Sequence, residues 1–280
     1  MNQWHDIINR IKASQFPCLC KSIDRSAPVA ASVKRSFFMK ITYLDHSGFL
    51  VESTTCYLLF DFVKGNLPTL QQDKPLYIFA SHFHADHFSK RIYETGHAPE
   101  LTTLFLGKGI FPKTVPDALK SRAHIMKKHE GYSDALIRVG TLDSNDSGVA
   151  FIVEIKDTSD TPSPKTPSAH HTLYFAGDLN AWYWDGDEED KKLMRIYHEE
   201  LMRIKGRHFD LAFIPLDPRL KQYETLGISD FFEYCTADVI IPMHCWGEME
   251  VITRARENTA LGDYRKNIWE IRQGGDTLAV

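Results

Sequence analysis

The sequence predicts a layered α/β protein, because short apolar strand patterns alternate with helical patterns along most of the chain. The clearest helical pattern covers residues 188–205, where Leu193, Tyr197 and Leu201 recur at helical spacing. The composition is that of a globular protein with a sizeable core: 280 residues, of which 43% are apolar and 25% charged. Strands interleaved with helices favour sheets that are covered by helices.

Residues 1–38 differ from the rest of the chain. They contain one short helix-like stretch near residues 6–12, followed by a polar run of small residues without a sustained period. We therefore interpret residues 1–38 as a peripheral N-terminal extension and residues 39–280 as the main domain.

The predicted strands begin after this extension. Residues 40–61 hold three short β-rich runs separated by Ser-Gly and Thr-Thr turn signals, which predicts an antiparallel meander. The apolar run at residues 76–81 is typical of a strand buried on both faces. Further strands are predicted at residues 102–107, 135–139, 149–155, 172–177, 211–215 and 239–243. The Pro/Ser/Thr-rich residues 157–169 predict an exposed loop.

Charge and apolar content argue against two classes of partner. The formal net charge is −4 and the basic residues are scattered, so we expect no nucleic-acid partner. No apolar stretch approaches the roughly 18–20 residues that span a bilayer, and the N-terminus lacks the apolar core of a secretion signal. The five cysteines form neither an even set nor a zinc-ribbon spacing, which predicts reduced, mostly buried thiols. We expect a cytoplasmic protein without a membrane contact.

The strongest functional signal is the motif HFHADH, which directly follows the apolar strand pattern at residues 76–81. Histidines two positions apart on extended backbone project to the same side. Imidazole and carboxylate groups are common ligands of zinc and similar ions. His82 and His84 can therefore hold one ion, while Asp86 and His87 face a second. A solvated histidine-rich loop is the alternative interpretation.

A metal centre needs further ligands, and strand ends on a rigid sheet can aim them. Asp178 follows the apolar run LYFAG, and His244 follows VIIPM. Taken alone, each residue could simply mark a strand that meets water. Together with the histidine motif, they become candidate ligands.

The order HxHxDH, then an aspartate after FAG, then a histidine after IIPM, resembles the metallo-β-lactamase superfamily of metal-dependent hydrolases. The run LDHSGFLVES is similar to a strand turn in the branch that includes ascorbate-6-phosphate lactonase and related phosphoesterases and lipases. The resemblance covers the chain from about Met39 to the C-terminus. It implies a four-layer αβ/βα sandwich with metal ions at one edge, between two sheets.

The resemblance also implies how the ligands divide between two sites. The first site takes His82 and His84, and the second takes Asp86, His87 and His244. One or two divalent ions are implied, most often zinc, with manganese or iron as alternatives.

The resemblance further implies that Asp178 bridges both ions. This agrees with electrostatics, since two cations about 3.5–4 Å apart need a shared anion to offset their repulsion. Such ions lower the pKa of bound water, which then attacks a carbonyl or phosphoryl centre. Asp86 would orient this nucleophile or accept its proton.

The sequence departs from the family pattern at the first site, where a third histidine is expected between the motif and the bridging aspartate. Residues 141–155 contain no histidine, and Asp146 is our choice among the oxygen donors there because it lies just before a strand. An aspartate in this place would give a harder site that tolerates manganese or iron. Alternatively, the first site is weak, or one of four other histidines folds in: His124, His129, His170 or His171.

Three further residues are candidates for substrate contacts or for supporting the ligands. His46 precedes a Ser-Gly turn and could reach the metal rim, as a group that contacts substrate or supports a ligand, or it could pack in the core. Trp182 follows the bridging aspartate and could line a substrate pocket, or simply pack. Arg219 could bind a phosphate or carboxylate, or form an ion pair with Asp217.

These observations favour a metal-dependent hydrolase that acts on a small-molecule ester, lactone or phosphoester. A non-catalytic metal-binding or ligand-sensing module on the same fold is an alternative, which the missing histidine motivates. An iron-dependent dioxygenase of the superfamily is another. The sequence does not indicate the substrate or the oligomeric state.

Overall fold

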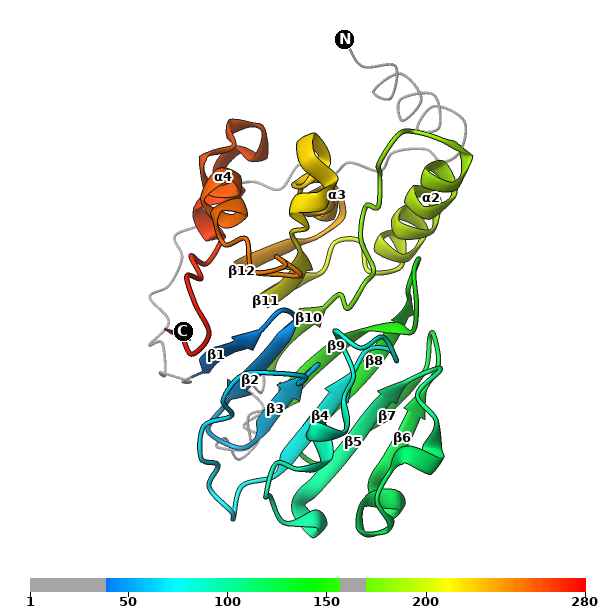
Figure 1. The fold of residues 1–280 in the computed structure, drawn as a ribbon, viewed down its shortest axis with the longest axis vertical. Helices are drawn as coiled ribbons and strands as arrows, with labels where there is room; N and C mark the ends of the chain where they lie inside the picture. The colour runs from blue at the N-terminus through cyan, green and yellow to red at the C-terminus, as the bar shows by residue number, and fades with distance from the viewer. Residues whose placement is uncertain (1–38, 157–169) are drawn as a thin grey trace, which may run out of the picture. The chain divides into compact units, whose positions relative to one another are not determined.

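A computed structural model describes residues 39–156 and 170–280 of the chain (Figure 1). The predicted N-terminal extension, residues 1–38, and the predicted loop, residues 157–169, lie outside these described residues. The described residues form two β-sheets of seven and six strands, as expected for a layered α/β protein. No helix among them is both long and apolar enough to cross a membrane.

The first sheet combines an antiparallel meander with parallel strands. Its order is β13-β1-β2-β3-β4-β5-β6, in which β1 to β3 pair antiparallel and β3 to β6 pair parallel. The predicted meander and the predicted buried strand at residues 76–81 are confirmed. The strands are β1 (Lys40–Asp45), β2 (Gly48–Glu52), β3 (Tyr57–Phe60), β4 (Leu76–Ala80), β5 (Thr102–Gly107), β6 (Ala123–Met126) and β13 (Thr277–Ala279).

The second sheet has the order β12-β11-β10-β9-β8-β7, with β7 to β10 antiparallel and β10 to β12 parallel. The strand predicted at residues 135–139 starts two residues later and runs further, because it pairs with β9 along its whole length. The short strands β6, β7 and β13 were not predicted from the sequence. The strands of this sheet are β7 (Gly131–Ser133), β8 (Ile137–Asp143), β9 (Val149–Lys156), β10 (His170–Phe175), β11 (His208–Pro215) and β12 (Thr236–Met243).

Three α-helices cover the outer face of the second sheet (Figure 1): α2 (Glu188–Arg203), α3 (Leu226–Tyr234) and α4 (Glu250–Glu257). The helix predicted at residues 188–205 is confirmed as α2. It begins after Asp187, whose side chain accepts a hydrogen bond from the Asp190 backbone N–H, and its first turn is acidic, which suits the positive end of the helix dipole.

The outer face of the first sheet is covered differently. Leu59 and Ile78 point outward and pack under Ile92 and Leu119, which lie in short 3₁₀ segments. These segments and their loops replace α-helices as the fourth layer of the sandwich. The six 3₁₀ segments of the described residues are η1 (Lys90–Tyr93), η2 (Pro99–Leu101), η3 (Pro112–Thr114), η4 (Asp117–Arg122), η5 (Pro218–Tyr223) and η6 (Thr259–Asn267).

An aromatic core fills the space between the sheets. Phe60 of the first sheet stacks on Phe175 of the second, with ring centroids 4.6 Å apart, and Phe49 meets Phe213 at 5.0 Å. Such buried rings contribute large apolar areas and fix the distance between the sheets. Among the described cysteines, Cys56, Cys235 and Cys245 are buried free thiols, as predicted.

Two backbone hydrogen bonds join the sheets at one edge. The Val149 N–H donates to the Ser81 carbonyl over 3.1 Å, and the His244 N–H donates to the His46 carbonyl over 3.3 Å. At the same edge, Gly107 lies so close to Ser81 that an added Cβ would overlap the Ser81 backbone oxygen. The backbone that carries the histidine motif is therefore held on two sides.

We expect Gly107→Ala to lower the free energy of unfolding by about 1–3 kcal/mol, because the new methyl group must displace backbone rather than a flexible side chain. Gly140→Ala is the matched control, since an added Cβ there meets no atom within 4 Å. Urea unfolding followed by circular dichroism measures both variants. Equal stabilities for the two would contradict the close approach.

Candidate metal centre

The candidate ligands meet at one edge of the sandwich because parallel strands end there. The motif from His82 to His87 follows β4, Asp178 follows β10 by three residues, and His244 follows β12 directly. The Asp178 carboxylate lies 3.0 Å from His87, 3.2 Å from His82 and 3.5 Å from His244. Groups separated by some 160 positions of sequence thus lie within coordinating distance of one point.

The first cluster consists of His82, His84, Asp146 and Asp178, whose ligand atoms all lie within 4.8 Å of one another. The turn between β8 and β9 carries Asp146, whose Oδ2 lies 3.8 Å from His84 Nδ1. Burial, and then the neighbouring Asp178, raise the pKa of Asp146. Asp146 therefore occupies the place that the sequence analysis proposed for it, and whether it binds an ion stays a prediction.

The other histidines considered for this cluster are engaged elsewhere. His124 stacks on Phe105 with centroids 5.5 Å apart, His129 contacts Glu200 at 2.9 Å, and His171 contacts Asp210 at 3.1 Å. His170 begins β10, at the end of that strand far from the metal edge.

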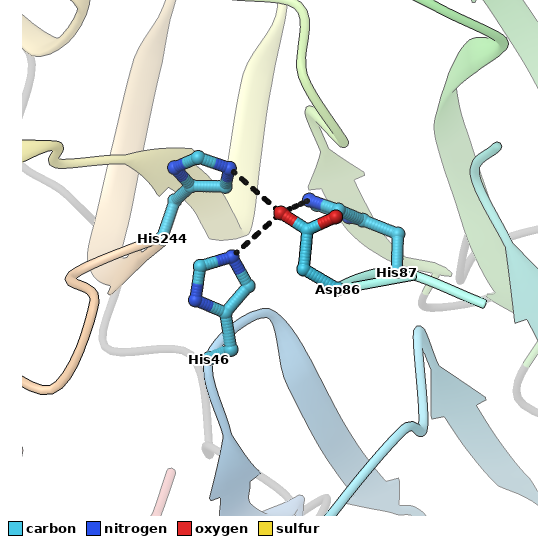
Figure 2. A group of neighbouring side chains, drawn as sticks. All are labelled: His46, Asp86, His87 and His244. Carbon is cyan, nitrogen blue, oxygen red and sulfur yellow. Dashed lines mark ion pairs between the residues drawn. The ribbon is translucent and has the colours of Figure 1, made fainter. Parts of the chain in front are cut away.

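The second cluster consists of His46, Asp86, His87 and His244 (Figure 2). The Nε2 atoms of the three histidines lie 3.4, 3.9 and 3.8 Å, respectively, from the Asp86 Oδ2. Figure 2 shows the imidazoles arriving from different directions around this carboxylate. His46, which the sequence analysis placed at the rim, lies within this cluster.

The electrostatics favour ionised carboxylates at Asp178 and Asp86, in contrast to Asp146. Burial raises the pKa of Asp178, but His87, His82 and His244 outweigh it and hold the pKa well below its usual range. Burial likewise opposes ionisation of Asp86, and His46 and His87 again lower its pKa. Ionised carboxylates are the form that binds cations.

The residues fit metal ions by a second criterion, the lack of hydrogen-bond partners. Among the residues that the structure describes, four buried ligand atoms have none: Nε2 of His46, His82 and His87, and Oδ1 of Asp178. Buried polar atoms normally find partners, since leaving one unsatisfied costs about 1–3 kcal/mol. These atoms lie near one another without hydrogen-bond geometry, which is the arrangement expected of ligands that share a cation.

Two buried aspartates orient two of the histidines through their Nδ1 atoms. Asp61 lies 2.7 Å from His87 Nδ1, and Asp217 lies 3.0 Å from His244 Nδ1. A carboxylate on one ring nitrogen leaves the other nitrogen free to bind a metal. Neither role was predicted from the sequence. Asp61 directly follows β3 and Asp217 closely follows β11, and a position just after an apolar strand is the signal that identified Asp178.

The rim of the second cluster is aromatic. Arg219 donates from Nε to Asp217 Oδ1 over 2.9 Å, which confirms the predicted ion pair, and its guanidinium lies 4.4 Å from the Trp246 ring centroid. Trp182 is buried and donates from Nε1 to the Asp178 carbonyl over 2.8 Å. Its neighbour Trp184 is exposed and stacks parallel to it.

No protein-family model and no curated protein matches the sequence. Solved structures do match the fold. A metallo-β-lactamase fold protein, YhfI from Bacillus subtilis, is 14% identical, with a TM-score of 0.50 over 88% of this chain and 100% of its own. The chain has the metallo-β-lactamase fold. This confirms the four-layer sandwich, whereas the narrower resemblance to ascorbate-6-phosphate lactonase stays a prediction.

Two further structures with this fold carry different chemistry. A metallo hydrolase from the archaeon Ignicoccus hospitalis is 14% identical, with a TM-score of 0.53 over 87% of this chain and 98% of its own. A diiron β-hydroxylase from Streptomyces venezuelae is 10% identical, with a TM-score of 0.53 over 86% of this chain and 54% of its own. At these identities the similarity concerns the fold alone.

We expect Asp217→Asn to weaken metal binding about 10–100-fold, because His244 loses the carboxylate that orients its ring. Asp210→Asn is the matched control: it also removes a carboxylate from a histidine, His171, but away from both clusters. Competition with a chromophoric chelator measures the affinities. A loss of similar size in both variants would show that the effect is not specific to the metal centre.

Proposed function

We propose that this protein is a metal-dependent hydrolase that cleaves a small ester, lactone or phosphoester. The observation that carries the proposal is the pair of adjacent His/Asp clusters on either side of Asp178. Each cluster offers imidazole nitrogens and carboxylate oxygens for one divalent ion, and Asp178 has an oxygen directed to each side. This donor set suits zinc, and its carboxylates also suit manganese or iron.

When bound, such ions lower the pKa of water and polarise a carbonyl or phosphoryl oxygen. The chain itself supplies the remaining functions. Asp178 holds negative charge between the clusters, and Asp61 and Asp217 fix the orientation of His87 and His244. Asp86 is the proposed proton acceptor, because its carboxylate is partly exposed within the second cluster.

The side chains around the centre favour a substrate with a flat apolar group. Phe83 is exposed beside His84 of the first cluster, with centroids 4.8 Å apart. Trp246 is exposed beside His244 of the second cluster, and the Arg219 guanidinium lies over both Trp246 and the exposed Trp184. An aromatic group on the substrate would bury apolar area against these rings. Arg219 remains a candidate for contact with a phosphate or carboxylate, although its ion pair with Asp217 already uses two of its donors.

A second candidate is an iron-dependent oxygenase. The observation in its favour is Asp146, which makes the first cluster richer in oxygen donors than a three-histidine site. Elemental analysis of the purified protein separates the two candidates, since iron at both sites together with O₂ consumption would favour oxygenation.

We expect the metal-loaded protein to hydrolyse at least one of three generic substrates: 4-nitrophenyl acetate, δ-valerolactone and bis(4-nitrophenyl) phosphate. Chelation should abolish the activity. His84→Ala and Asp178→Ala should each lower the activity by more than about 100-fold. This exceeds the loss of about 10–100-fold that is typical when a residue that hydrogen-bonds to a metal ligand is changed. His208→Ala, an exposed histidine at the start of β11, is the control that should keep full activity.

An absence of turnover on all three substrates, with both sites filled, would contradict the hydrolase proposal. The protein would then be a metal-binding or ligand-sensing module on the same fold.

We expect Trp184→Ala to raise KM for an aryl ester, such as 2-naphthyl acetate, by about 2–10-fold, the equivalent of one aromatic contact of about 0.5–1.5 kcal/mol. The KM for ethyl acetate, which lacks a ring, should not change. Met202→Ala on α2 removes another exposed apolar side chain and serves as the control. Equal changes for both esters would contradict an aromatic contact at Trp184.

A further inference from the structure

We propose that the two metal sites are unequal. His46 completes the second cluster as a metal ligand and makes it a closed site that holds its ion tightly. The first cluster is then the open site, which exchanges its ion and presents it to the substrate. This inference rests on the metal binding proposed above and not on hydrolysis.

The position of His46 is that of a ligand. Its Nε2 is buried, has no hydrogen-bond partner among the described residues, and lies 3.4 Å from Asp86 Oδ2. Its ring lies 4.4 Å from the His244 ring and 5.6 Å from the His87 ring, between centroids. Figure 2 shows its nitrogen directed at the same oxygen as those of the other two histidines.

The backbone at His46 is held in an unfavourable conformation. His46 is the first residue of the two-residue turn between β1 and β2, and its φ is +51°. Glycine is preferred at a positive φ in such turns, and histidine there costs free energy. The His46 carbonyl accepts the hydrogen bond from His244 N–H that joins the sheets. A residue whose strained backbone conformation is fixed by its neighbours is often a functional residue.

Ligand number distinguishes the two clusters. With His46, the second cluster offers three imidazoles and Asp86, in addition to the shared Asp178. The first cluster offers two imidazoles and Asp146, in addition to Asp178. Metal sites that are filled by protein ligands are structural in character, whereas catalytic sites keep a position open for water or substrate.

Solvent exposure points the same way. In the second cluster the side chains of His46, His87 and His244 are 12%, 0% and 3% exposed, and that of Asp86 is 29% exposed. In the first cluster His82 is 0% exposed, whereas His84 and Asp146 are 40% and 47% exposed. Exposed ligands release an ion more readily, because water can replace them one at a time. Substrate can reach an ion held by His84 and Asp146 by the same route.

The groups that contact the Nδ1 atoms of the metal-binding histidines increase this difference between the two clusters. Buried carboxylates orient both His87 and His244. In the first cluster, His82 Nδ1 has the neutral Ser81 hydroxyl at 3.0 Å. A carboxylate raises the basicity of a metal-binding imidazole more than a hydroxyl does. The second site therefore gains affinity from ligand number, from burial and from the charges behind its histidines.

The test is a chelator titration of the full chain loaded with zinc, and separately with manganese, in which the metal content is measured by elemental analysis. We expect wild-type protein to release one ion per chain at least about 10-fold more readily than the other. Asp146→Ala should remove the weakly held ion and leave the tight one.

His46→Asn is the informative variant for the second site. Asparagine tolerates positive φ, so the turn is kept, while its shorter amide lacks the imidazole nitrogen. We expect the tight phase of release to weaken at least about 10-fold, while the weak phase persists. His46→Gly, which also accepts the turn, should behave in the same way, and circular dichroism confirms that the variants are folded. His208→Ala is the control.

Two outcomes would overturn the inference: release of both ions with equal affinity from wild-type protein, or an unchanged tight phase in folded His46→Asn. Either result leaves the hydrolase proposal standing. A chain that binds no divalent ion would instead overturn the proposed function, and with it this inference.

Discussion

The Asp178 carboxylate is the interaction on which the rest of the site depends. It is almost completely buried, and a buried charge is costly unless charged or polar groups surround it. His82 and His87 approach it from the strand end after β4, and His244 approaches it from the strand end after β12. The Asp178 carboxylate and the groups that contact it therefore come from three strand ends in two sheets. The buried charge of Asp178 is tolerated only because these strands end at the same place.

The core side chains and the strands around the centre fix the positions of these groups. The aromatic stack of Phe60 and Phe175 lies in the core between the sheets, and β3 and β10, which carry these rings, lead to Asp61 and Asp178. Rigid strands position such groups more accurately than loops do. Unfavourable backbone conformations are concentrated at the same edge. Of the six described non-glycine residues with positive φ, four belong to the centre or adjoin it: His46, Asp61, His244 and Trp246. Such conformations persist only where the surroundings fix them.

The metallo-β-lactamase fold does not by itself define the reaction. A metallo hydrolase and a diiron β-hydroxylase share it with this chain at similar TM-scores. The features that bear on the reaction are therefore local: Asp146 in the first cluster, His46 in the second, and the exposed aromatic rings near both. Under the proposed function, oxygen donors broaden the choice of metal, and ligand number decides which ion is accessible. These features, more than the sandwich around them, would then determine the substrate.

The sequence by itself determined most of the strands, helix α2 and the likeness to a metal-dependent fold, because apolar periodicity and the HxHxDH spacing are local properties. It also singled out Asp178 and His244, since both end apolar strands. Asp61 shows the same signal, but nothing along the chain tells which strand ends share an edge. The sequence offered Asp146 for the first cluster as one of several alternatives, and only the tertiary structure placed it there and His46 in the second cluster. Both lie in hairpin turns, and the position of a turn relative to distant strands is set by sheet pairing and core packing.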